Sequence, residues 1–73
     1  MVDYVRYLLV ANERTPSWLA RKIGVSHTLV YSWLNGVRTI NEKHFEKTVK
    51  VFGLTLEQAK KRIEESKLLI NRI

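Results

Sequence analysis

The apolar residues of this 73-residue chain recur at intervals of three and four, the spacing that places side chains on one face of a helix. The pattern is clearest where Phe45, Val49 and Phe52 fall at i, i+4 and i+7. Similar spacing recurs in four other segments, and no segment alternates with the period of two that is typical of strands. The pattern therefore predicts an all-α protein with five helices.

Capping residues and glycines predict where these helices begin and end. Each apolar segment follows a residue of the N-cap type, and Gly24, Gly36 and Gly53 follow three of the segments. Thr55 also has Gln58 three residues later, as in a capping box. The predicted helices run from Asp3 to about Asn12, from Thr15-Pro16 to Gly24, from Ser26 to Asn35-Gly36, from Asn41 to Gly53, and from Thr55 nearly to Ile73.

Residues 15–36 form a pair of short helices with a connection of only about three residues. Ala20 is small enough for two helix backbones to approach closely, and Gly24 tolerates the left-handed backbone of the turn. Val30 and Trp33 lie three residues apart and hold the second helix against the core. This arrangement predicts a helix-turn-helix, whose second helix enters the major groove of DNA.

The net charge of the chain indicates which kinds of molecule the protein can bind. The chain has 13 Lys and Arg residues against 7 Asp and Glu, a net charge of +6 and a pI near 10.0. This balance favours a polyanionic partner, which is either nucleic acid or an acidic protein. The plain alternative is a basic surface that only keeps the protein in solution.

Other chemistry is absent from the sequence. There is no cysteine, and His27 and His44 are far apart, so we expect no disulfide, metal or other cofactor. No nucleophile motif or phosphate loop is present, and we expect no enzymatic activity. The longest apolar run, at 8–11, is too short to span a membrane, and the start MVDYVRYLL does not read as a secretory signal. The expected compartment is the cytoplasm.

The chain resembles the helix-turn-helix domains of the Cro and phage-repressor type, the lambda-repressor-like family. The resemblance rests on L-A, G-V-S, W-x-N-G and G-L-T-L, at the family's offsets, in TPSWLARKIGVSHTLVYSWLNGVRTI followed by NEKHFEKTVKVFGLTLEQ. No gap is needed between Thr15 and Gln58.

The resemblance implies which positions contact DNA. Base contacts are implied for His27, Thr28, Tyr31 and Ser32, and backbone contacts for Thr15, Ser17, Ser26, Asn35, Arg38 and Lys43. The helix from Ser26 to Asn35 contains no Lys, Arg or Gln, although these side chains make many of the recurrent contacts with DNA. We therefore expect the flanks to supply the positive charge.

The chain departs from the family at several positions. Pro16 stands where the family has Gln, Trp18 where it has an acidic residue, and Ile40 where it has Pro. Leu9 and Leu34 occupy two positions at which the family often has a paired Arg and Glu. Because an ion pair replaced on both sides by apolar groups can be neutral or stabilising, we predict that Leu9 and Leu34 touch.

Two aromatic side chains have competing interpretations. We expect Trp33 to lie in the core. We expect Trp18 to pack beneath the C-terminal helix, with a contact to another protein as the alternative.

The last helix extends beyond the usual family domain, from about residue 60 to 73. Its spacing supplies more apolar surface than a tail needs, with dimerisation candidates Ile63, Leu68, Leu69, Ile70 and Ile73. Folding back on the core is the main alternative. Glu64 and Glu65 argue against binding to a membrane surface. We interpret residues 1–73 as a single domain.

The sequence thus favours a DNA-binding transcriptional regulator, of phage or mobile-element type, acting as a homodimer on double-stranded DNA. Two alternatives remain open. One is a protein-interaction module on the same fold, such as a co-regulator or anti-repressor. The other is an excisionase-like architectural DNA-binding factor.

Overall fold

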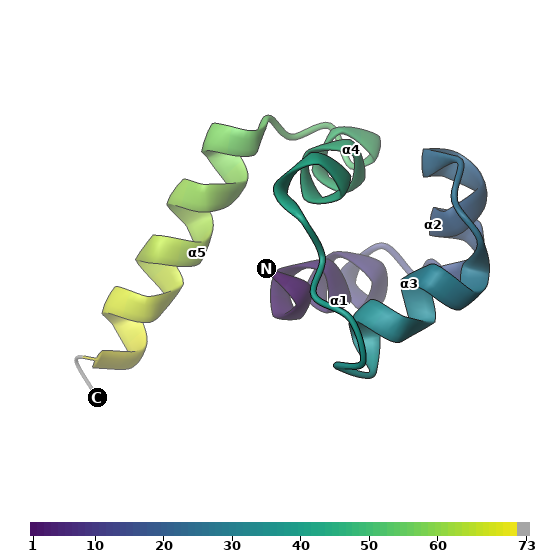
Figure 1. Ribbon diagram of the computed structural model, residues 1–73. Helices are drawn as coiled ribbons and strands as arrows, with labels where there is room; N and C mark the ends of the chain where they lie inside the picture. Colours follow the sequence, from purple (N-terminus) through teal and green to yellow (C-terminus); the bar gives the residue numbers. More distant parts are fainter. Residues whose placement is uncertain (72–73) are drawn as a thin grey trace.

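Residues 1–71 of this protein form five helices and the segments that connect them (Figure 1). The computed structural model describes the backbone of residues 1–71 and the side chains of residues 1–66. The elements are α1 (Val2–Ala11), α2 (Pro16–Ile23), α3 (His27–Leu34), α4 (Glu42–Val51) and α5 (Leu56–Asn71). No strand occurs within residues 1–71, so the all-α, five-helix prediction is confirmed.

Side-chain caps fix the starts of α2, α3, α4 and α5 as predicted. Three hydroxyl or amide oxygens each accept the N–H three residues later: Thr15 Oγ1 from Trp18 (3.1 Å), Ser26 Oγ from Leu29 (3.2 Å) and Asn41 Oδ1 from His44 (2.8 Å). Thr55 and Gln58 form the predicted capping box, with reciprocal bonds of 3.1 and 2.9 Å. These local bonds satisfy amide groups that a helix start leaves without intrahelical partners.

The prediction that Asp3 caps α1 is wrong. The helix begins at Val2 with Met1 as its N-cap, and the carbonyl of Met1 accepts the N–H of Val5 at 3.2 Å. Asp3 lies in the first turn, where a negative charge is favourable near the positive end of the helix dipole, and pairs with Arg6 at 2.9 Å.

The core joins one face of each helix. Phe45 and Val49 of α4 are fully buried, and they lie in one cluster with Leu19, Val30 and Trp33. Trp33 is 3% exposed, which confirms its core position. Helix α5 adds Ala59 and the half-buried Ile63 at its start, and lies on the opposite side of α4 from α2 in Figure 1.

Trp18 does not lie beneath α5. Its ring packs against Phe52, at the C-terminal end of α4, with a centroid distance of 5.8 Å. The Arg14 guanidinium lies 4.8 Å from the Trp18 centroid and the Lys22 ammonium 5.8 Å from it. Trp18 thus packs within the protein as predicted, but it packs against α4 rather than α5, because α4 lies between α2 and α5.

Helices α1 and α3 pack against each other beside this core. Leu9 is buried, and the half-buried Leu34 packs against the same apolar cluster. Direct contact between the two side chains stays a prediction. Of the dimerisation candidates, the side chains of Leu68, Leu69, Ile70 and Ile73 lie outside the described residues.

Candidate nucleic-acid interface

The turn between α2 and α3 is held by the carbonyl of one alanine. Gly24 adopts a left-handed backbone with φ of +77°, and its N–H and that of Val25 both donate to the Ala20 carbonyl at 3.0 Å. Ala20 is buried, as expected where two helices approach closely. The turn therefore holds α3 against α2 and leaves one side of α3 open.

The open side of α3 carries the four residues implied as base contacts. Val30 and Trp33 are buried, whereas His27, Thr28 and Tyr31 are exposed and Ser32 is half-buried. The rings of His27 and Tyr31 lie edge to face, 6.4 Å between centroids, one helical turn apart. The structure thus brings the four side chains together on one face.

A shallow hollow beside this face joins α3 to the loop that follows it. Ser26, Thr28, Leu29, Ser32 and Arg38 line this hollow, which has a volume of about 310 Å³. The backbone N–H groups of Val37 and Arg38 both donate to the Ser32 carbonyl, at 2.9 and 3.1 Å. The loop is therefore bonded to α3, and Arg38 lies beside Thr28 and Ser32.

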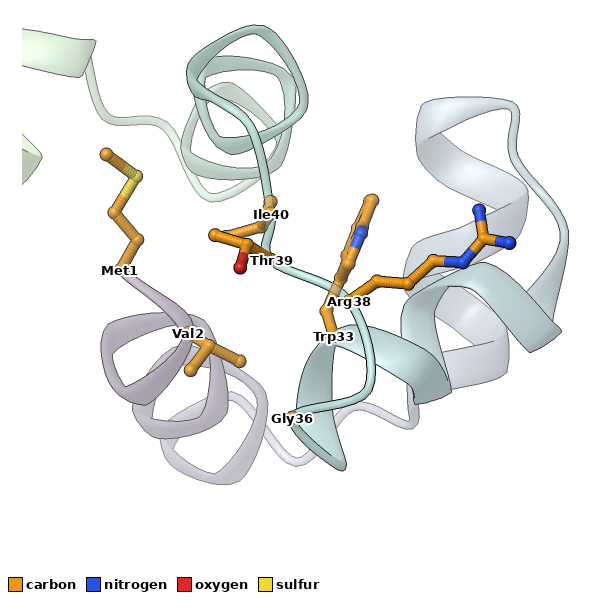
Figure 2. A pocket seen from close by; sticks show the side chains of 7 residues that line it. All are labelled: Met1, Val2, Trp33, Gly36, Arg38, Thr39 and Ile40. Atoms are coloured by element: carbon orange, nitrogen blue, oxygen red, sulfur yellow. The ribbon is translucent and has the colours of Figure 1, made fainter.

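Arg38 also borders a second hollow, of about 260 Å³, on the other side of the loop, between the start of α1 and the residues before α4. Figure 2 shows the Arg38 side chain extending across α3, away from Met1 and Val2. The guanidinium therefore projects toward the side of the loop on which α3 and α2 lie, not into the second hollow.

The Ser32 hydroxyl already makes a hydrogen bond within α3, which limits what it can donate to DNA. It donates to the Leu29 carbonyl at 2.6 Å, so its proton is used within α3. The Ser32 oxygen can still accept a hydrogen bond from an N–H group of a DNA base. Donation to a base requires the hydroxyl to rotate away from Leu29.

The implied backbone contacts differ in how they are placed. The hydroxyls of Thr15 and Ser26 accept amides of their own helices, which leaves their O–H protons, together with the open N–H groups of the helix starts, able to donate to a phosphate. Ser17 is half-buried in the first turn of α2, and Asn35 is exposed at the end of α3. Lys43 is exposed in the first turn of α4 and does not line the hollow beside α3.

Charge is distributed unevenly along the chain. Residues 14–41 include Arg14, Arg21, Lys22 and Arg38 but no Asp or Glu, since all seven acidic residues lie elsewhere. Among the side chains of residues 1–66, the ion pairs are Arg6–Asp3, Lys50–Glu46 and Lys60–Glu42, all outside this segment. The helix-turn-helix is therefore positive through its surroundings, although α3 itself carries no Lys, Arg, Asp or Glu.

This acid-free segment is the site feature that position-by-position analysis missed. Arg14, Arg21 and Lys22 each look like ordinary surface residues when read singly. The signal lies in the absence of acidic residues over the whole of 14–41, which the sequence shows plainly.

The described part of the chain has neither a metal site nor a membrane-spanning helix. No group of three His, Cys, Asp or Glu side chains there is arranged to hold a metal ion. None of the described helices is both long and apolar enough to cross a membrane.

Comparison with known families supports the arrangement. A helix-turn-helix family model matches residues 5–59, from α1 to the first turn of α5. No curated protein and no solved structure matches the chain significantly. The matched segment includes both helices of the motif and the helices that support them. Because it covers most of the chain, the protein belongs to the lambda-repressor-like helix-turn-helix family of DNA-binding regulators.

Proposed function

We propose that this protein is a sequence-specific transcriptional regulator of the Cro or repressor type, from a phage or another mobile element. The observation that carries the proposal is the joint placement of Thr28, Ser32 and Arg38 around one hollow, beside an exposed face of α3. Short polar groups that can bond base edges thus lie next to a cation that can bond phosphate.

The proposed mechanism divides the contacts between α3 and its flanks. Helix α3 enters the major groove, where His27 faces guanine acceptors and Thr28 bonds base edges or contacts a thymine methyl group. Tyr31 and Ser32 lie beside them on the same exposed face of α3 and contact the neighbouring bases. Asn35, Arg38, Lys43 and the start of α2 around Thr15 and Ser17 hold the phosphates. Occupancy then blocks or assists RNA polymerase at the regulated promoter.

We also propose a two-fold arrangement on DNA. Residues 1–73 act as one domain in the cytoplasm, and the apolar side of α5, beginning with the half-buried Ile63, joins two copies. Such a dimer places two α3 helices in successive major grooves, about one turn of DNA apart. Protein concentration, dimerisation or a protein partner then sets occupancy.

The test is to measure DNA binding against salt concentration. A preferred duplex is first selected from a random pool, and affinities for it and for random duplex are compared. We expect His27→Ala to weaken binding to the preferred duplex by roughly tenfold and to leave random duplex unaffected. Arg38→Ala should weaken both and lower the slope of log affinity against log salt by about one.

Lys61→Ala is the matched control for charge, because Lys61 is an exposed cation on α5. It should leave both the slope and the sequence preference unchanged. A folded protein that binds no duplex at low salt contradicts the proposal, and favours a protein-interaction module. Binding that bends DNA without base preference favours the architectural alternative.

A further inference from the structure

Arg6 links the first helix to the end of α3. Its Nη2 donates to the Leu34 carbonyl at 2.6 Å, and its Nη1 donates to Asp3 Oδ1 at 2.9 Å. Leu34 is the last residue of α3. One guanidinium thus bonds a carboxylate of its own helix and the main chain of the helix that is proposed to read DNA.

The Leu34 carbonyl is the one carbonyl in the last turn of α3 that accepts no hydrogen bond from a nearby backbone N–H. The last four carbonyls of a helix have no intrahelical partner. In α3, three of them accept from the residues that follow: Tyr31 from the N–H of Asn35, Ser32 from those of Val37 and Arg38, and Trp33 from that of Gly36. Arg6 supplies the partner for the fourth, so the carbonyls of the last turn are all satisfied.

Arg6 also supplies a charge that α3 lacks. Helix C-termini carry a partial negative charge that a nearby cation stabilises. Helix α3, described in full, has no basic residue in its last turn. A cation from α1 therefore occupies the favourable position, and the fork of the guanidinium fixes the direction of the bond.

We propose that Arg6 is a positioning residue, which sets the orientation of α3 on the domain and thereby the sequence discrimination of the protein. This inference rests on the proposed function, because it assigns α3 the reading of bases. Helix α3 has only eight residues, and Val30 and Trp33 are its buried side chains. Leu29 and Leu34 pack partly against the same core. A directed bond at the end of so short a helix adds a restraint on its tilt and rotation to this apolar packing.

The experiment measures orientation and DNA discrimination separately. Residual dipolar couplings of the free protein give the orientation of α3 relative to α1 and α4. We expect Arg6→Ala to change that orientation, whereas Asp3→Asn, which removes the ion pair but keeps the bond to Leu34, leaves it unchanged. In DNA binding, Arg6→Ala should reduce the ratio of preferred to random affinity by roughly tenfold. The loss on random duplex should not exceed that of Lys61→Ala.

Each other outcome has a defined meaning. An unchanged orientation of α3 in folded Arg6→Ala overturns the proposal, whatever the DNA result. Equal losses on both duplexes, with a salt slope reduced by about one, show that Arg6 binds phosphate and also overturn it. If Arg6→Ala does not fold, Arg6→Lys decides, since it keeps the charge but loses the fork. A folded Arg6→Lys with unaltered α3 and unaltered discrimination counts against the proposal. A wild-type protein without sequence preference refutes the proposed function alone, because the couplings still test the positioning.

Discussion

The hydroxyl of Tyr4 offers a sharp test of how this small core is stabilised. Tyr4 packs at the edge of the core, with its ring centroid 6.0 Å from that of Tyr7 and 6.5 Å from that of Phe45. Its Oη is buried, and it has no hydrogen-bond partner among the residues that the structure describes. We predict that Tyr4→Phe raises the free energy of unfolding.

The size of the effect follows from two opposing contributions. A buried polar group without a partner costs about 1–3 kcal/mol, which the substitution recovers. Removing the oxygen leaves a void of roughly 10 Å³, which costs about 0.2 kcal/mol at the rate found for core cavities. The ring contacts are retained because Phe has the same ring. The net gain is about 0.8–2.8 kcal/mol, and each 1 kcal/mol corresponds to a rise in Tm of about 4–8 °C in a domain of this size.

The assay is equilibrium unfolding in urea, followed by circular dichroism and by the fluorescence of Trp18 and Trp33. Tyr7→Phe is the matched control, because Tyr7 is 62% exposed and its hydroxyl is open to water. The control should change stability by less than about 0.5 kcal/mol. A loss of stability in Tyr4→Phe refutes the reasoning, since it shows that Oη has a favourable partner in the folded protein.

Two further sets of substitutions test the backbone of the turn and the packing behind α3. Gly24→Ala should destabilise the protein by about 1–2 kcal/mol in urea unfolding, because φ is +77° while a Cβ at Gly24 meets no atom within 4 Å. Gly24→Asn should cost less, since Asn tolerates this backbone, and equal costs for Ala and Asn contradict a purely backbone effect. Leu9→Ala and Leu34→Ala, singly and together, should show a coupling energy of about 0.5–1 kcal/mol if the side chains touch, measured with a stabilising osmolyte present. Additive losses contradict the predicted contact.

The features of the fold that depend on neighbouring residues could be predicted from the sequence. The caps at Thr15, Ser26 and Asn41 and the capping box at Thr55 each depend on bonds spanning three residues, so the sequence contains both partners in order. Asp3 was the exception. A terminal turn can begin at any of several residues when its first amides are open to water, and a carboxylate in the first turn is favourable without being the cap.

Contacts that depend on how helices cross could not be predicted. Arg6 and Leu34 are 28 residues apart, and their bond exists because α1 and α3 approach at the end of α3. Trp18 meets Phe52 rather than α5 because α4 lies between them. Spacing along the chain identifies the buried face of a helix, but it does not identify which residue of another helix meets that face.

In the candidate site, the exposed face of α3 could be predicted from the sequence, but the hydrogen bonds of its side chains could not. The exposure of His27, Thr28 and Tyr31 follows from the burial of Val30 and Trp33 on the other side of α3, which their spacing indicates. The hydrogen bond of the Ser32 hydroxyl could not be predicted in this way. Its donation to Leu29 is one of several rotamers open to a serine in a helix, and no pattern in the sequence selects it.

The neutral face of α3 has a consequence for how the protein discriminates among DNA sequences. The strongest base contacts are bidentate, made by Arg, Lys, Asn or Gln, and each is worth about 1–3 kcal/mol. In the proposed complex the side chains of His27, Thr28, Tyr31 and Ser32 would make single bonds, and Ser32 must first release the Leu29 carbonyl before it can donate. If the proposed contacts are made, one copy should discriminate weakly, while the cations of the acid-free segment 14–41 attract any duplex. In the proposed dimer, two copies joined by a two-fold axis would double the discrimination energy, and this is the reason for proposing that two copies bind together. The orientation of α3 then matters correspondingly more, because weak single bonds tolerate little misplacement, and the proposed role of the bond from Arg6 is to fix that orientation.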